Sequence, residues 1–103
     1  MKRVVLIHWN AAEAPGRVER LHRAGFAVEF LLPQGGKSFA GIRANPPSVL
    51  VIDLGRLPSH GRAVAIFFRQ QKVTRYVPLV FVDGALEKIS ATRKLLPDAV
   101  YAD

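Results

Sequence analysis

The stretch Ser48-Val49-Leu50-Val51-Ile52-Asp53-Leu54 decides the fold of this chain. Residues 49–52 are apolar without a break, which is typical of a parallel strand that is buried on both faces. The run ends at one carboxylate, Asp53, and Pro58 and Gly61 then introduce a turn and a helix. In open α/β sheets, ligands and reactive groups gather at the carboxyl ends of the strands. Asp53 is therefore the first candidate site residue.

Similar apolar runs alternate with helical patterns on both sides of this strand. The sequence predicts strands at residues 2–7, 26–32, 48–53, 78–83 and 99–102, and helices at residues 11–24, 37–44, 61–71 and 85–96. Alternation of this kind indicates βαβ units and a parallel sheet with right-handed crossovers. The expected fold is a single α/β domain over residues 1–103, with a five-stranded parallel sheet of flavodoxin-like order 2-1-3-4-5.

Each predicted helix carries apolar side chains that we expect to pack on the sheet. They are Ala14, Val18 and Leu21 in the first helix, Phe39 and Ile42 in the second, Val64, Phe67 and Phe68 in the third, and Leu86, Ile89 and Leu96 in the fourth. Gly25 is placed to end the first helix. No helical pattern follows residues 99–102, so we expect the last helix of the fold to be missing and one face of the third and fourth strands to be partly bare. Such a face would attract a second copy of the chain or further sequence.

Composition limits the classes of protein to which the chain can belong. It has 103 residues, half of them hydrophobic, and a net charge of +7, with a pI near 10.6. The absence of cysteine excludes disulfides, thiol chemistry and zinc–thiolate sites. No apolar run approaches the roughly 20 residues of a membrane span. We therefore expect a cytoplasmic protein that does not insert into membranes.

The order and spacing of several segments resemble the receiver domain of response regulators, the CheY-like family. The first strand and its end read Lys2-Arg-Val-Val-Leu-Ile-His-Trp-Asn10, the second strand begins within Arg23-Ala-Gly-Phe-Ala-Val-Glu29, Pro46-Pro47 precede the third strand, and the fourth lies in Val77-Pro-Leu-Val-Phe-Val82. The resemblance covers nearly the whole chain. It implies a role in two-component (phosphorelay) signal transduction, with Asp53 as the phosphoacceptor equivalent.

The chain departs from the receiver pattern at most other reactive positions. The resemblance places His8 and Trp9 where receivers carry an acidic pair, Asp83 at the Thr or Ser position, and the Lys position at or near Asp103. Magnesium prefers oxygen ligands, and imidazole and indole do not replace them. A carboxylate at position 83 would also repel a phosphoryl group. We therefore predict a degenerate receiver that binds no magnesium, has no cofactor and is not an enzyme. It would act by protein–protein contact, with a homodimer as one form.

Other interpretations of the same residues remain open. Asp53 could serve only as a strand-end carboxylate that accepts backbone N–H groups, and we prefer this structural role. The residues His8, Asp53, Asp83 and Asp103 could together bind zinc or manganese, although strand ends are polar in any case. Trp9 could pack in place of the acidic pocket or contact a partner, and packing is preferred.

Basic residues suggest an alternative function, that of a nucleic-acid-associated protein. They recur on the first helix and around the third: Arg17, Arg20, Arg23, Arg62, Arg69, Lys72 and Arg75. Such a face could contact phosphates. The sequence contains no helix-turn-helix, phosphate loop or aromatic platform to accompany these charges. A solvated helix face is therefore the preferred explanation.

Overall fold

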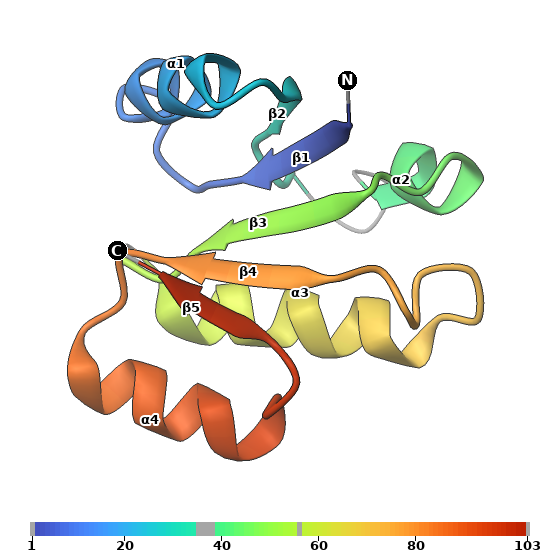
Figure 1. Ribbon diagram of the computed structural model, residues 1–103. Helices are drawn as coiled ribbons and strands as arrows, with labels where there is room; N and C mark the ends of the chain where they lie inside the picture. Colours follow the sequence, from blue (N-terminus) through green and yellow to red (C-terminus); the bar gives the residue numbers. More distant parts are fainter. Residues whose placement is uncertain (1, 35–38, 56, 103) are drawn as a thin grey trace.

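The computed structural model describes residues 2–34, 39–55 and 57–102, and its strands and helices alternate along the chain (Figure 1). The elements are β1 (Arg3–Ile7), α1 (Ala14–Arg23), β2 (Ala27–Leu31), α2 (Ala40–Ala44), β3 (Val49–Asp53), α3 (Pro58–Gln70), β4 (Leu79–Val82), α4 (Leu86–Leu95) and β5 (Val100–Ala102). All strand pairs are parallel, and the strand order is β2-β1-β3-β4-β5. The predicted sheet is confirmed.

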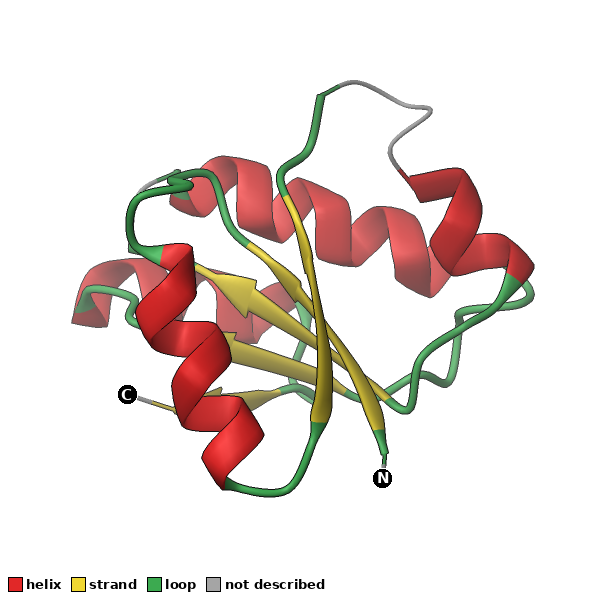
Figure 2. Ribbon diagram, turned by 90° about the horizontal axis from the view of Figure 1, so that it is seen from above, coloured by secondary structure: helices red, strands yellow, loops and turns green. Residues whose placement is uncertain are grey.

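The helices cover the two faces of the sheet unequally. Figure 2 views the molecule from the α1 side, with α1 in front of the strands and the other helices behind them. The larger core lies on the α3 side, where Leu50 and Ile52 of β3 are fully buried. Phe68 of α3 contacts Phe39 there, with ring centroids 5.2 Å apart. On the α1 side a smaller cluster forms around Val4, Leu6 and Val51.

The ends of α1 and α3 follow from local chemistry. Gly25 has a φ of +96°, a left-handed conformation that costs glycine little, and it follows the last turn of α1 as predicted. Helix α3 begins at Pro58, three residues earlier than the sequence pattern predicts. Proline suits the first turn of a helix because its missing N–H would have no partner inside the helix there. Helix α1 likewise carries a proline in its first turn and begins at Ala14.

Two helix predictions need correction or restriction. Leu86 does not anchor α4: it begins the helix and is 83% exposed, whereas Ile89 and Leu96 do contact the core. The predicted start of the second helix, at residues 37 and 38, lies outside the described residues. Its described part begins at Ala40, and the predicted contacts of Phe39 and Ile42 with the core are confirmed.

No helix among the described residues has the length and apolar character needed to cross a membrane.

Candidate functional site

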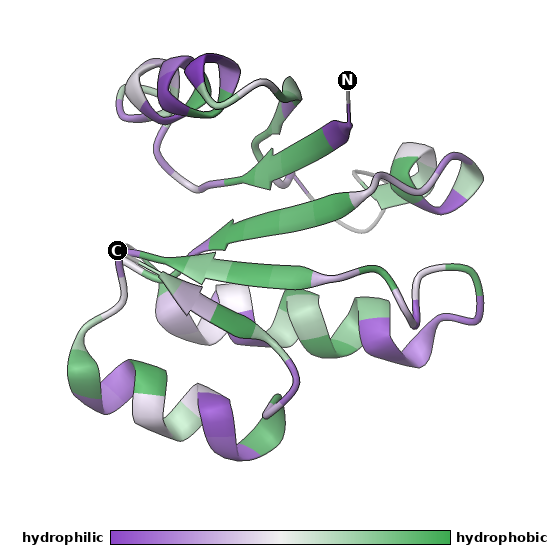
Figure 3. Cartoon of the chain, in the orientation of Figure 1, coloured by the Kyte–Doolittle hydropathy of each residue, from purple (hydrophilic) through white to green (hydrophobic). Residues whose placement is uncertain are grey.

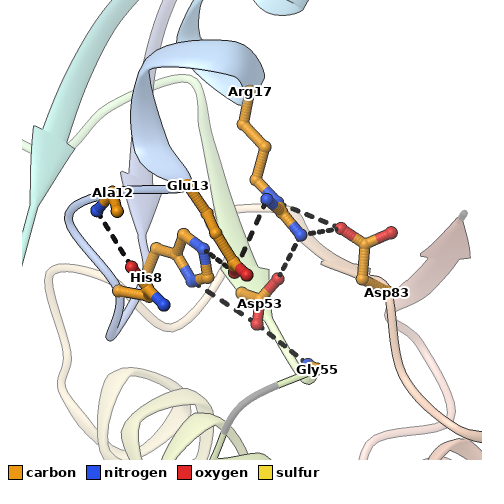
Figure 4. A network of polar contacts seen from close by, with 8 residues as sticks. His8, Ala12, Glu13, Arg17, Asp53, Gly55 and Asp83 are labelled. Carbon is orange, nitrogen blue, oxygen red and sulfur yellow. Dashed lines mark hydrogen bonds and ion pairs between the residues drawn. The ribbon is translucent and has the colours of Figure 1, made fainter.

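The carboxyl ends of β1, β3 and β4 bring polar side chains together at one edge of the sheet (Figure 4). His8 follows β1, Asp53 ends β3 and Asp83 follows β4. The start of α1 crosses this edge and adds Glu13 and Arg17, both of which point toward Asp53 in Figure 4. The resulting group contains acidic and basic side chains from three separate stretches of the sequence, around residues 8–17, 53 and 83. We call these five residues the Asp53 cluster.

Asp53 is completely buried, and both of its carboxylate oxygens have cationic or N–H neighbours. Its Oδ1 accepts a hydrogen bond of 2.8 Å from the backbone N–H of Gly55. The same oxygen lies 3.4 Å from Nδ1 of His8. Its Oδ2 lies 3.2 Å from Nη2 of Arg17. The contact with Gly55 is the backbone bond predicted for a strand-end carboxylate.

His8 is also fully buried and lies between two carboxylates. Its Nε2 is 3.1 Å from Oε1 of Glu13, and its Nδ1 faces Asp53. A neutral imidazole can donate one proton and would therefore bond to one of these carboxylates, whereas an imidazolium can donate to both. In either state the ring fills the space beside Asp53 where the receiver resemblance places an acidic residue.

Arg17 is the cation at the centre of the cluster. Its guanidinium bonds to Asp83 through Nε, at 3.0 Å, and through Nη2. Nη2 also pairs with Asp53, and Nη1 lies 3.8 Å from Oε1 of Glu13. The planar fork of an arginine suits such bridging because it presents several donors in fixed directions. One side chain therefore bridges three carboxylates.

The prediction that Arg17 belongs to a solvated basic face is wrong. Only 23% of its side chain is exposed. Arg17 lies one turn from Ala14 and Leu21, which both face the sheet, so its side chain extends along the sheet edge instead of into solvent. Arg69 also differs from the prediction, since it donates to the carbonyl oxygens of Arg75 and Val77.

The loops after β3 and β4 lie against each other at the cluster. A Cβ on Gly55 would lie 3.0 Å from the backbone oxygen of Asp83 and 3.3 Å from Oδ1 of Asp53. Only glycine fits this approach without displacing one of the loops. Asp83 itself has a φ of 61°, a left-handed conformation that aspartate tolerates better than most residues. Gly55 is thus the point where the two loops meet.

The structure brings together some of the predicted site residues and separates others. His8 and Asp53 are in contact, and Arg17 connects Asp83 to them. Trp9 points elsewhere: it packs against the α3-side core and lies edge-on to His60, with ring centroids 6.0 Å apart. This agrees with the preferred packing role. Asp103 lies outside the described residues, so the predicted set of four metal ligands cannot be placed as a whole.

No group of three or more His, Cys, Asp or Glu side chains among residues 2–34, 39–55 and 57–102 is arranged to hold a metal ion. Arg17 lies between the carboxylates that would otherwise be candidates. Glu13 and Arg17 were both missed as site residues by the sequence interpretation. Their spacing of four residues at the start of a helix that follows a strand is the one sequence signal that could have drawn attention to them.

Comparison with known proteins identifies solved structures that have the same fold. Neither a family model nor a curated protein sequence matches the chain. Among solved structures, the chain is similar to the N-terminal domain of a response regulator receiver protein from Methanoculleus marisnigri JR1, with a TM-score of 0.77 and 14% identity, over 100% of this chain and 83% of that one. A bacteriophytochrome response regulator matches with a TM-score of 0.73 and 18% identity, over 98% of this chain and 68% of that one.

A response regulator protein from Burkholderia multivorans is also similar, with a TM-score of 0.60 and 16% identity, over 99% of this chain and 81% of that one. At these identities the likeness establishes the fold. The chain therefore has the CheY-like receiver fold that its sequence resembles.

Proposed function

We propose that this chain is a degenerate receiver, a module of response-regulator signalling that acts through protein contact. In this role Asp53 does not accept a phosphoryl group through magnesium-dependent chemistry, and the chain is not an enzyme. The observation that carries the proposal is the closed environment of Asp53, which is 0% exposed, with Oδ1 hydrogen-bonded to Gly55 and Oδ2 in an ion pair with Arg17.

Steric access argues against phosphoryl transfer to Asp53. The acceptor oxygen must approach the phosphorus atom of a donor in line with the leaving group. Oδ1 is occupied by the N–H of Gly55 and Oδ2 by the guanidinium of Arg17, so neither oxygen is directed toward solvent. A donor could react only after Arg17 had left both Asp53 and Asp83.

Electrostatics point in the same direction. A magnesium ion needs several oxygen ligands in octahedral geometry. The other carboxylates of the cluster belong to Glu13 and Asp83, and both already lie within 4.0 Å of Arg17 nitrogen atoms. We infer that Arg17 supplies the positive charge that an ion supplies in an active receiver. Because Arg17 is attached to α1, it cannot enter or leave the site as a bound ion does.

The structure supports the nucleic-acid alternative less than the sequence does. Two of the arginines on which that idea depended, Arg17 and Arg69, have their charges bonded inside the molecule. The sequence has no helix-turn-helix or aromatic platform to accompany the remaining basic residues. Protein contact is therefore the preferred mode of action.

Incubation with acetyl phosphate and Mg²⁺, followed by intact-mass spectrometry, tests the proposal. The expected result is no addition of a phosphoryl group to the wild-type chain, as for the control variant Asp53→Asn. A receiver with an intact acidic pair, treated in parallel, shows that the donor is active. A phosphoryl adduct on the wild type that is lost in Asp53→Asn would disprove the proposal.

A further inference from the structure

One aromatic side chain lies almost entirely in solvent. Tyr76 is 86% exposed, whereas every other Phe, Tyr and Trp side chain is buried or half-buried. It belongs to the loop of residues 71–78 that joins α3 to β4 (Figure 1), which we call the Tyr76 loop. A tyrosine with this exposure adds nothing to the core. Tyrosine is, however, among the residues that are enriched at the energetic centres of protein interfaces.

The neighbours of Tyr76 in the loop are a second exposed apolar side chain and two cations. Val73 is 58% exposed, and Lys72 and Arg75 are both exposed. Figure 3 shows the loop as short hydrophobic segments between hydrophilic ones. Neither cation forms an ion pair with another residue of the described ranges. The Tyr76 loop therefore presents aromatic, aliphatic and cationic groups together.

Side chains from inside the molecule hold this loop in one conformation. Thr74 is fully buried, and its hydroxyl donates a hydrogen bond of 2.7 Å to the carbonyl oxygen of Phe68. Arg69 is 17% exposed. Its Nη1 donates to the carbonyl oxygens on either side of Tyr76, those of Arg75 at 3.0 Å and Val77 at 2.6 Å. A loop that is fixed before binding loses less conformational entropy when a partner docks.

The Tyr76 loop lies at the edge of the sheet where the parallel strands begin, because it leads into the start of β4. This is the opposite edge from the Asp53 cluster. Lys2, which precedes β1, is also exposed at this edge, and Asp98 there is paired with Arg69 at 2.9 Å. The charge without a partner among the described residues of this edge is therefore positive. Carboxylates of a binding partner would be attracted to it.

A second copy of the chain does not supply such carboxylates. Every acidic residue in the described part of the chain except Glu87 is ion-paired with a basic residue of the same chain. Glu87 is followed directly by Lys88. Two copies, each with a net charge of +7, would also repel each other. The partner that suits the loop is a different, acidic chain.

A nucleic acid or a membrane suits the loop less well than a protein does. Proteins that bind single-stranded nucleic acids stack successive bases on several aromatic side chains, and this loop exposes one. Cationic surfaces that bind anionic lipids gather about four to eight Lys or Arg residues, and this loop carries Lys72 and Arg75. A rigid tyrosine beside an arginine is instead typical of the residues that dominate binding between proteins.

We propose that the Tyr76 loop binds an acidic segment of a partner protein. An apolar side chain of that segment would pack on the ring of Tyr76 and on Val73. Carboxylates beside it would pair with Lys72 and Arg75. The inference rests on the proposed function, since it names the surface through which protein contact occurs.

Titration of the chain with two synthetic peptides tests the inference. Both peptides carry one phenylalanine and one leucine; one has glutamates around them, and the other has lysines at the same positions. Fluorescence anisotropy measures the affinity, and ¹⁵N–¹H chemical shifts locate the contact. We expect the glutamate peptide to bind at least about tenfold more tightly than the lysine peptide. The shifts should concentrate in the Tyr76 loop.

Matched pairs of variants separate local contact from net charge. Arg75→Glu should weaken binding of the glutamate peptide by about tenfold, whereas Arg20→Glu, the same charge change on α1, should weaken it by no more than about twofold. Tyr76→Ala should also weaken binding by about tenfold, which is ~1.4 kcal/mol. Leu86→Ala, which removes another exposed side chain, should have no effect. All four positions are exposed, so the variants should fold, and circular dichroism checks this.

Three results would overturn the inference. The first is that the glutamate peptide does not bind at millimolar concentration, and the second is that Arg75→Glu and Arg20→Glu weaken its binding equally. The third is a different occupant of the loop. A wild-type dimer that is lost in Tyr76→Ala would show this, as would tighter binding of a single-stranded oligonucleotide or of phosphatidylserine vesicles that depends on Tyr76. The phosphorylation assay reports on Asp53 at the opposite edge of the sheet, so the two proposals can fail separately.

Discussion

Replacing Arg17 with alanine removes the cation on which the Asp53 cluster depends. At the 3.2 Å that separates Nη2 from Oδ2 of Asp53, two unit charges attract by about 5 kcal/mol with an effective dielectric constant of about 20. Solvent reaches part of this pair, since 23% of the Arg17 side chain is exposed. The variant also no longer incurs the cost of desolvating the guanidinium on folding, which offsets part of the loss. We therefore expect Arg17→Ala to lower the free energy of unfolding by about 3 kcal/mol, the lower end of the range for breaking a buried pair.

Urea unfolding monitored by circular dichroism measures this loss. Arg20→Ala is the matched control, because Arg20 is exposed on the same helix and should change stability by no more than about 0.5 kcal/mol. Arg17→Lys should give an intermediate value, since it keeps the charge but not the planar fork. A double-mutant cycle with Asp83→Ala should then give a coupling energy of about 1–3 kcal/mol between residues 17 and 83.

A divalent cation provides the second measurement. In Arg17→Ala the carboxylates of Glu13, Asp53 and Asp83 lose their shared counter-ion, and Mg²⁺ or Mn²⁺ should recover stability in proportion to RT ln(1 + [L]/Kd). The wild type should respond less at every concentration. The reasoning fails if Arg17→Ala and Arg20→Ala have the same free energy of unfolding. It also fails if the metal ions stabilise the wild type and Arg17→Ala equally.

Two further predictions concern the loop contact and the last strand. Gly55→Ala should destabilise the chain by about 1–3 kcal/mol in urea unfolding, because its Cβ would lie 3.0 Å from the backbone oxygen of Asp83. Gly16→Ala, which meets nothing within 4 Å in α1, should be neutral or stabilising, and equal effects of the two changes would contradict the steric argument. Burial raises the pKa of Tyr101, so its contribution to stability is complete below the unfolded value of about 10 and falls as pH rises through the folded value. Tyr101→Phe should remove the part of the decline that occurs above about pH 10 and cost about 1 kcal/mol at neutral pH, since the hydroxyl bonds to the Leu96 carbonyl at 3.0 Å; a decline of the same size in both proteins would contradict it.

The alternation of unbroken apolar runs with helical patterns is the reason that the fold could be predicted from the sequence. The unbroken apolar run of β3 and its counterparts in β1 and β4 are long enough to identify buried strands, and their alternation with helices leaves few topologies. The position of Asp53 at the carboxyl edge followed directly from this pattern. His8 and Asp83 could be assigned to the same edge by the same reasoning.

The Asp53 cluster was harder to predict because its chemistry depends on long side chains. Arg17 has the same helical spacing as Arg20 and Arg23, and the sequence does not indicate that it reaches back across the end of the sheet. Glu13 was missed for the same reason. Leu86 shows the opposite error, since an apolar residue at the start of a helix was assigned to the core although it is exposed.

The bridge formed by Arg17 has a consequence for how such a module can be regulated. A bound ion exchanges with solution, so the state of its site follows the concentration of that ion. A guanidinium covalently attached to α1 is held at a high effective concentration beside its carboxylates and cannot be diluted away. A module with this counter-ion would keep one state at all times, and a cell could change its output only by changing the amount of the protein or of its partner.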